Sequence, residues 1–239
     1  MKQIDFCGLT FKGLHKKELL AFDDHLKVVV TANAEFIVKA QNNDRFKNII
    51  NTNYTTFDGR IPYILAKKKH PDIQFDKISG SDFIYDACQQ AKKLNLKVFL
   101  LGGYEESNTL AVQKLRELYD IEITGYSPPY APYPFAQEHN ENILSRISDF
   151  KPDILFVGFG AEKQEYWIMD NRSFLEQAGV KLAVGSGGTF EFVAGILHRA
   201  PKWIQDMGLE GFYRFIVEPK LFRFKRLLTS LKIFLYLNR

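Results

Sequence analysis

Hydrophobic residues along the chain follow two alternating patterns. Short β-branched or apolar runs, typical of buried strands, occur at 28–30, 97–103, 121–126, 153–160 and 181–188. Between them lie segments with apolar residues three and four positions apart, which predict helices. The strands are apolar enough to be buried on both faces. The alternation therefore predicts an α/β fold, a Rossmann-like, mostly parallel sheet flanked by helices.

The clearest helical pattern begins near Ser81, a residue suited to capping a helix. Further helices are expected from about Ala34, after "FDGR", through 110–119, at 136–149 and over 163–175. The segment 127–134 holds four prolines and is expected to be a loop. The apolar stripe of the helix near Ser81 is expected to consist of Phe83, Ile84, Ala87, Cys88 and Ala91.

The C-terminal residues differ in kind, because they are rich in aromatic and basic residues and lack the strand–glycine punctuation. We therefore divide the chain into a core, 1–195, and a helical appendage, 196–239. A helix is expected from Leu221 onward. Two interpretations stay open: a terminal helix docked on the core, or a helix lying in a membrane interface. The residues on one arc of its helical wheel are Leu221, Phe224, Leu227, Leu228, Leu231, Phe234 and Leu235.

Composition fits a globular protein, with 46% hydrophobic and 25% charged residues in 239. Two distant cysteines favour a reducing compartment without a disulfide framework. We expect neither a signal peptide nor a membrane-spanning segment. The net charge of +4 is uneven, because 196–239 carries nine of the 32 basic residues and three of the 28 acidic ones. The appendage is therefore expected to face an anionic surface or ligand.

Three predicted strands end in glycine, in "FLLGG", "FVGFG" and "AVGSGG". In a parallel sheet, ligands bind beyond the carboxyl ends of strands, where glycines let backbone N–H groups approach phosphate. Glycine in such a position is often only turn geometry, but three such loops favour a phosphate-bearing ligand such as a nucleotide. None matches a dinucleotide fingerprint or the phosphate loop of ATPases, and no metal-binding pair or nucleophile elbow occurs. Redox, metal-dependent and hydrolase functions are therefore disfavoured.

Eight segments follow one another along nearly the whole chain: "VVTANAEFIVKA", "FDGR", "SGSDF", "VFLLGG", "ITGYSPPY", "LFVGFGAEKQEYW", "VGSGGTFEFVAG" and "RAPKWIQDMGLEGFYRFIVEPKLFRFKRLL". In these segments and in their order, the chain resembles the bacterial WecG/TagA/CpsF glycosyltransferases.

This resemblance implies an inverting, metal-independent transferase without a cofactor. Such enzymes move a sugar, commonly N-acetylmannosamine or its uronic acid, from a UDP donor to an undecaprenyl-diphosphate-linked sugar, in the synthesis of teichoic acid or other surface polysaccharides. It also implies an appendage that completes the site and touches the membrane, hence a cytoplasmic enzyme peripheral to the inner face of the cell membrane. The alternative function is a non-catalytic nucleotide-binding scaffold recruited to the membrane. Nucleic-acid binding by the appendage is disfavoured, because the appendage is too apolar.

Asp58 lies in an Asp-Gly dipeptide, which alone is typical of a turn. The resemblance implies that this acid is the general base, and a carboxylate suits removal of the acceptor hydroxyl's proton. Further residues that the resemblance places at donor or acceptor sites are Thr31, Asn33, Gly102, Gly103, Gln164, Gly187, Gly188 and Glu191.

Some of these positions carry alternatives or depart from the family pattern. Thr31 and Asn33 could instead cap a loop. Glu191 stands where the family commonly has Asp, and Lys77 where it often has Arg. Arg60 replaces a small residue, and it marks either a different donor or a surface charge.

Arginines of the appendage are expected to bind the acceptor diphosphate and anionic headgroups, because the planar guanidinium donates paired hydrogen bonds to phosphate. Arg199 and Arg214 match family positions. Arg223 and Arg226 are also candidates, but they could pair only with the general charge of the lipid surface.

Overall fold

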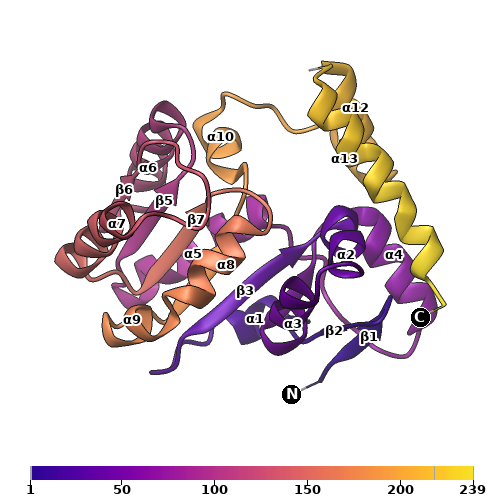
Figure 1. Ribbon diagram of the computed structural model, residues 1–239, viewed down its shortest axis with the longest axis horizontal. Helices are drawn as coiled ribbons and strands as arrows, with labels where there is room; N and C mark the ends of the chain where they lie inside the picture. The colour runs from indigo at the N-terminus through magenta and orange to yellow at the C-terminus, as the bar shows by residue number, and fades with distance from the viewer. Residues whose placement is uncertain (1, 218, 239) are drawn as a thin grey trace. The chain divides into compact units, whose positions relative to one another are not determined.

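The computed structural model describes residues 2–217 and 219–238 (Figure 1). Its principal sheet has six strands in the order β4-β3-β8-β7-β5-β6. The pairs β5–β6, β5–β7 and β7–β8 are all parallel, so the predicted mostly parallel α/β fold is confirmed. The strands are β3 Lys27–Ala32, β4 Tyr54–Phe57, β5 Val98–Gly102, β6 Ile123–Tyr126, β7 Ile154–Gly158 and β8 Leu182–Gly185.

The chain divides into two compact units. The first comprises residues 1–18, 30–79 and 198–239, and the second comprises 19–29 and 80–197. Strand β3 therefore contributes residues to both. The predicted appendage, 196–239, begins close to the start of the third segment of the first unit. That segment forms one compact unit with the N-terminal residues and with 30–79.

The four helices that the apolar spacing predicts in the second unit are present, and the stripe from Phe83 to Ala91 is buried as predicted. The expected helix 163–175 is divided, because α8 ends at Asp170 and α9 begins at Arg172. Helices α7, α8 and α9 share a core with one face of strands β5, β7 and β8. The helices of this unit are α5 Gly80–Leu94, α6 Glu105–Tyr119, α7 Gln137–Phe150, α8 Lys163–Asp170, α9 Arg172–Gln177 and α10 Thr189–Ala194.

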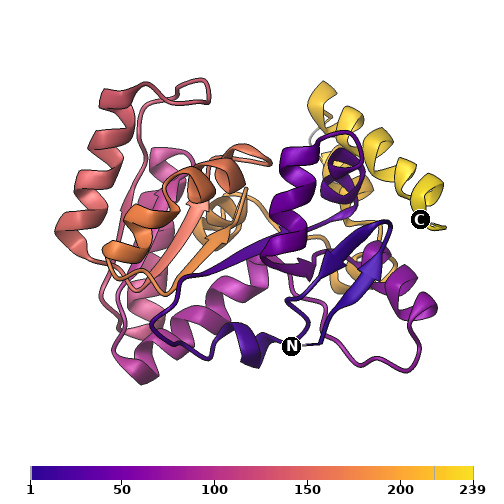
Figure 2. The ribbon, with the colours of Figure 1, turned by 60° about the horizontal axis from the view of Figure 1, so that its bottom comes forward.

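The first unit begins with an antiparallel hairpin, visible as two indigo arrows in Figure 2. The hairpin strands are β1 Ile4–Phe6 and β2 Leu9–Phe11. The short helix α1, Lys16–Leu19, follows at the boundary between the units. The further helices are α2 Ala34–Ala40, α3 Asp44–Thr52, α4 Arg60–Lys69, α11 Lys202–Asp206, α12 Glu210–Val217, α13 Leu221–Leu231 and the 3-10 helix η1 Lys232–Tyr236.

Buried aromatic rings fix the end of β4 in the first unit. The rings of Phe11 and Phe57 are stacked, with their centroids 4.1 Å apart, and Phe75 contacts Phe57 at 5.0 Å. Phe57 is fully buried and is the last residue of the strand. Rings packed in this way contribute more than their buried area alone. They hold the following residue, Asp58, in a fixed position.

Candidate functional site

Asp58 lies in the turn between β4 and α4. Its backbone N–H donates to the carbonyl oxygen of Ala32 at 3.0 Å, at the end of β3. The left-handed conformation of this turn is taken by Gly59, with φ +91°, which also occupies the cap position of α4. Glycine adopts such a φ without steric cost. The turn therefore needs Gly59, and it does not explain the carboxylate of Asp58.

The carboxyl group of Asp58 lies among charged side chains of the first unit. Its pKa is raised from 3.8 to about 7, first because burial disfavours the charged form and second because of the nearby carboxylate of Glu210. The cations of Arg214, Lys77 and Arg199, in that order, oppose this rise. A carboxyl group with a pKa near the working pH can both accept and release a proton. Such a pKa would suit a general base, and the catalytic role of Asp58 stays a prediction.

Lys77 reaches this cluster from the segment beside β4. Lys77 forms a parallel β-bridge with Phe57, and the backbone N–H of the next residue, Ile78, donates to the carbonyl oxygen of Phe57 at 3.0 Å. This pairing places Lys77 next to the strand end that carries Asp58. Lys77, which stands where the family often has arginine, therefore supplies a positive charge close to Asp58.

The two arginines that match family positions lie together around one carboxylate. Arg214 donates a hydrogen bond from Nη2 to Oε1 of Glu210, and Nε of Arg199 lies 3.6 Å from the same oxygen. A second nitrogen of Arg199 donates to Gln205 at 2.9 Å. Sequence reasoning missed Glu210. Its signal was the spacing of four residues between Glu210 and Arg214 on a helix.

Thr31 and Asn33 flank the end of β3. Thr31 is buried. Asn33 is the N-cap of α2, and its Oδ1 accepts a hydrogen bond from the N–H of Phe36 at 3.1 Å. The capping interpretation therefore holds for the oxygen of Asn33. A role of either residue at a substrate remains a prediction.

Arg60 and Arg226 contact the protein. Nε of Arg60 donates to the carbonyl oxygen of Asp206 at 3.1 Å, at the end of α11. Nε of Arg226 lies 2.6 Å from Oε2 of Glu35, whose side chain is 8% exposed. Arg223 lies on the same helix, α13, and is partly exposed. The diphosphate contacts expected for Arg223 and Arg226 stay predictions, and the pairing with Glu35 gives Arg226 a role in holding α13 against α2.

In the second unit, Gln164 joins two of the glycine loops. Its Oε1 accepts hydrogen bonds from the N–H groups of Gly160 at 3.2 Å and Gly187 at 3.0 Å. Its Nε2 donates to Oε1 of Glu165 at 2.7 Å. The side chain is buried, so these contacts fix its orientation. Gln164 therefore sets the geometry of both loops, whatever else it contacts.

Glu165 supports this arrangement from the first turn of α8. Its Oε2 accepts from the N–H of Glu162 at 2.9 Å, completing a capping box. Burial raises its pKa to about 7, against the hydrogen bonds that favour the charged form. A Cβ at Gly185 would come within 2.3 Å of the other oxygen of Glu165. Through these contacts Glu165 holds the start of α8 and the adjoining loop together.

Gly102 and Gly103 serve packing and backbone geometry, whereas a Cβ at Gly187 would meet nothing within 4 Å. Gly102 has φ +86° and Gly103 φ +73°, and a Cβ at these residues would lie within 3.0 Å of the rings of Phe159 and Phe190. The N–H of Gly103 donates to the carbonyl oxygen of Gly158 at 3.0 Å. Together with the bond from Gly187 to Gln164, this contact engages two of the amides that were expected at a phosphate. Their contact with a phosphate stays a prediction.

Glu191 lies beside the third loop. Its Oε2 would be 3.5 Å from a Cβ at Gly188, so its carboxylate approaches this exposed glycine. A carboxylate accepts hydrogen bonds from hydroxyl groups and repels phosphate. The position therefore fits a sugar hydroxyl better than a diphosphate oxygen, and the ligand contact remains a prediction.

The predicted residues fall into two sets. The set in the first unit is Thr31, Asn33, Asp58, Arg199, Arg214, Arg223 and Arg226; the set in the second is Gly102, Gly103, Gln164, Gly187, Gly188 and Glu191. Within residues 2–217 and 219–238, no group of three His, Cys, Asp or Glu side chains is placed to hold a metal ion.

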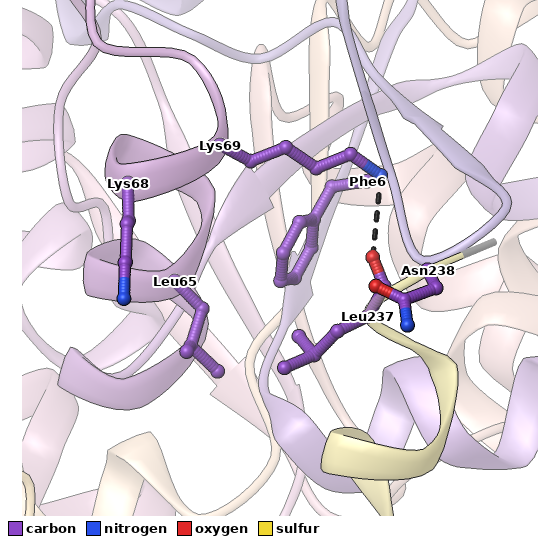
Figure 3. A pocket seen from close by; sticks show the side chains of 6 residues that line it. All are labelled: Phe6, Leu65, Lys68, Lys69, Leu237 and Asn238. Carbon is purple, nitrogen blue, oxygen red and sulfur yellow. Dashed lines mark hydrogen bonds between the residues drawn. The ribbon is translucent and has the colours of Figure 1, made fainter.

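A cavity of about 510 Å³ in the first unit is lined by none of the predicted site residues (Figure 3). Phe6, Leu65 and Leu237 form its apolar wall, and Lys69 donates to the carbonyl oxygen of Leu237 at 3.3 Å. Its remaining lining residues are Lys68 and Asn238. The hydrogen bond from Lys69 joins the end of α4 to the residue that follows η1.

A family model described as the glycosyl transferase WecG/TagA/CpsF family matches residues 4–238. The match extends over nearly the whole chain, and it confirms the resemblance seen in the individual motifs.

Proposed function

Because the chain belongs to the WecG/TagA/CpsF family of glycosyltransferases, we propose that it transfers a sugar from a UDP donor to a polyprenyl-diphosphate-linked acceptor. N-acetylmannosamine or its uronic acid is the sugar class that the resemblance implies, and the product belongs to a teichoic acid or another surface polysaccharide. The single observation that carries the proposal is the position of the Asp58 carboxyl group, held after β4 in a cluster with the cations of Lys77, Arg199 and Arg214.

The reaction is a direct displacement at the anomeric carbon. The carboxylate of Asp58 takes the proton of the acceptor hydroxyl as its oxygen forms the new bond to that carbon. The bond from the anomeric carbon to the diphosphate oxygen breaks at the same time, and UDP leaves with the electron pair. One displacement inverts the configuration. No metal takes part in the step as proposed, in keeping with the family.

Arg199 and Arg214 are proposed to bind the diphosphate of the lipid-linked acceptor. Guanidinium groups suit this ligand because their donors match phosphate oxygens in pairs. Both side chains are partly buried and lie near Asp58, whose pKa they lower. Such a diphosphate would be held in the same charged cluster as the base. The loops around Gly103, Gln164 and Gly187 are proposed to form the donor site of the second unit.

The third segment of the first unit supports a site at a membrane surface. Helix α13 places Arg226 against the buried Glu35, whereas its apolar arc is largely exposed. A helix of a globular protein normally buries its apolar face, so this arrangement favours an apolar environment outside the protein. Basic residues of the same helix suit anionic headgroups. The exposed apolar residues of α11, α12 and α13 and their flanks are Trp203, Met207, Leu209, Phe212, Ile216, Val217, Leu221, Phe224, Leu228 and Leu231, with Met207 just after α11 and Leu209 just before α12.

No helix within residues 2–217 and 219–238 is both long enough and apolar enough to cross a bilayer. We propose peripheral binding at the inner face of the cell membrane. Truncation after Pro219 is expected to reduce sedimentation with anionic liposomes and use of the lipid acceptor more than it reduces affinity for UDP. Equal loss of all three would instead identify the segment as structural.

The proposed function is tested by incubating the protein with a panel of UDP-sugars and a short-chain polyprenyl-diphosphate-linked sugar, and identifying products by mass spectrometry. We expect one donor to give a product that carries one added sugar. Absence of product with every donor, together with absence of UDP binding, would refute the proposal. UDP binding without turnover would favour the scaffold function.

A further inference from the structure

Glu210 contacts both Arg199 and Arg214 in the first unit. Arg214 donates to its Oε1, and Nε of Arg199 lies 3.6 Å from the same atom. The side chains of Arg199, Glu210 and Arg214 are 23%, 25% and 32% exposed. All three act electrostatically on Asp58. The cluster therefore places an internal anion where the proposed function requires a diphosphate.

Helix stability explains only part of this arrangement. Glu210 is the first residue of α12, where an acid interacts favourably with the helix dipole, and its pairing with Arg214 across one turn adds a little more. Neither effect accounts for Arg199, which lies before α11 and thus outside the helix. Nor does either explain why the carboxylate lies close enough to Asp58 to act on it.

We propose that Glu210 is a positioning residue that holds Arg199 and Arg214 beside Asp58 until a phosphate ester of the substrate replaces its carboxylate. This inference rests on the proposed function. Carboxylate and phosphate bind guanidinium through the same paired hydrogen bonds, so one can take the place of the other. Glu210 keeps the two cations partly neutralised while the site is empty, and the exchange breaks no covalent bond.

Two measurable consequences follow for a Glu210→Gln variant. The charged groups that face Asp58 are Glu210 and Arg214 from α12, Arg199 from the preceding segment and Lys77 from beside β4. Removal of the one anion among them leaves three cations, so the pKa of Asp58 falls below about 7. The arginines also lose a competing partner, so affinity for inorganic pyrophosphate rises, by about two- to fivefold for a pair of this exposure.

The two shifts together distinguish positioning from a merely structural role. A loosened fold would also expose Asp58 and lower its pKa, but it would disperse the arginines and weaken pyrophosphate binding. Protein labelled with ¹³C at the Asp carboxyl groups is titrated by NMR, with the Asp58 resonance identified by its absence in Asp58→Asn. Pyrophosphate affinity is measured by calorimetry. The matched control is Glu176→Gln, which removes an ion pair with Arg172 in the second unit and is expected to change neither value.

The proposal is overturned if Glu210→Gln leaves the Asp58 midpoint unchanged, or if pyrophosphate binds equally or more weakly. Should that variant fail to fold, Glu210→Asp keeps the charge but draws the carboxylate away from the arginines. It is expected to tighten pyrophosphate binding in smaller measure, and an unchanged affinity overturns the proposal. Neither readout needs a sugar donor or turnover. Both shifts without any glycosyl transfer would therefore refute the proposed function alone.

Discussion

Replacement of Gln164 by alanine is expected to destabilise the second unit and to separate its glycine loops. The change removes two hydrogen bonds from Gly160 and Gly187 to Oε1, and one from Nε2 to Glu165. Each such bond contributes about 0.5–1.5 kcal/mol net, and the lost buried side chain leaves a small cavity. Because the two glycines are partly exposed, water can satisfy the freed N–H groups. We therefore expect a loss of about 2–4 kcal/mol.

A loss of this size lowers Tm by about 5–15 °C in a chain of this length, which differential scanning calorimetry detects readily. Loss of the Gln164 donor also removes a contact that favours the charged form of Glu165, so the pKa of Glu165 rises further. UDP affinity is expected to fall in the same variant, because the loops no longer share an anchor.

An exchange variant, Gln164→Glu with Glu165→Gln, provides the matched control. Its glutamate can accept from both glycines, and its glutamine can donate to that glutamate while accepting from Glu162. The exchange should therefore recover most of the lost Tm. Gln164→Glu alone places two carboxylates together, so it should be stable at pH 5 and lose stability above pH 7. A Tm of Gln164→Ala within 1 °C of the wild type would refute the role of these bonds.

Three further predictions concern stability. Folding raises the pKa of Asp58 from 3.8 to about 7, so its contribution to the stability of the fold is lost as pH rises through 7. Asp58→Asn should therefore stabilise the fold at pH 8, by at most about 4 kcal/mol, and not below pH 4. Equal Tm changes at both pH values would contradict this. Gly185→Ala should destabilise the fold, since a Cβ there would meet a buried carboxylate oxygen at 2.3 Å. Gly188→Ala, whose Cβ would have its nearest atom at 3.5 Å, should not. Equal Tm changes in the two variants would exclude the clash. Glu35→Gln should speed limited proteolysis of α13, because it removes the partner of Arg226; an unchanged cleavage rate would show that the pair is not needed.

Long, regularly spaced patterns made the fold predictable. The stripe from Phe83 to Ala91 and the apolar strands at 97–103 and 153–160 gave the type and order of elements in the second unit. Tight local geometry was not predictable. The hairpin strands Ile4–Phe6 and Leu9–Phe11 are three residues each, too short for an alternating pattern to be recognised.

The helix expected at 163–175 shows another limit. The apolar spacing of this segment continues through Asn171. The side chain of Asn171, however, donates to the carbonyl oxygen of Trp167 and accepts a hydrogen bond from Asn140 in α7. These contacts depend on the tertiary structure and accompany the break between α8 and α9. The pattern of one segment cannot reveal them.

The sequence nominated candidate site residues where a motif is specific, and their roles stay predictions. Asp58 and the arginines Arg199 and Arg214 could be named because their motifs are specific. The contacts of these arginines with Glu210 depend on how distant segments pack. The hydrogen bonds of Gln164 to two loops depend on such packing as well. For the glycines, the sequence suggested phosphate binding, which stays a prediction, and the structure adds that a Cβ at Gly102 or Gly103 would meet an aromatic ring.

The most direct test of the central claim is the pH dependence of sugar transfer by the wild type and Asp58→Asn. We expect the wild-type rate to rise with pH through a single acid limb with a midpoint of about 7, as the carboxyl group loses its proton. Asp58→Asn should bind UDP as tightly as the wild type, but it should transfer the sugar at least about a hundredfold more slowly. Its rate should also lack the acid limb of the pH profile. Asp72→Asn, at an exposed position of the same unit, should behave as the wild type. An Asp58→Asn enzyme that keeps the wild-type rate and its pH profile would show that this carboxylate is not the base.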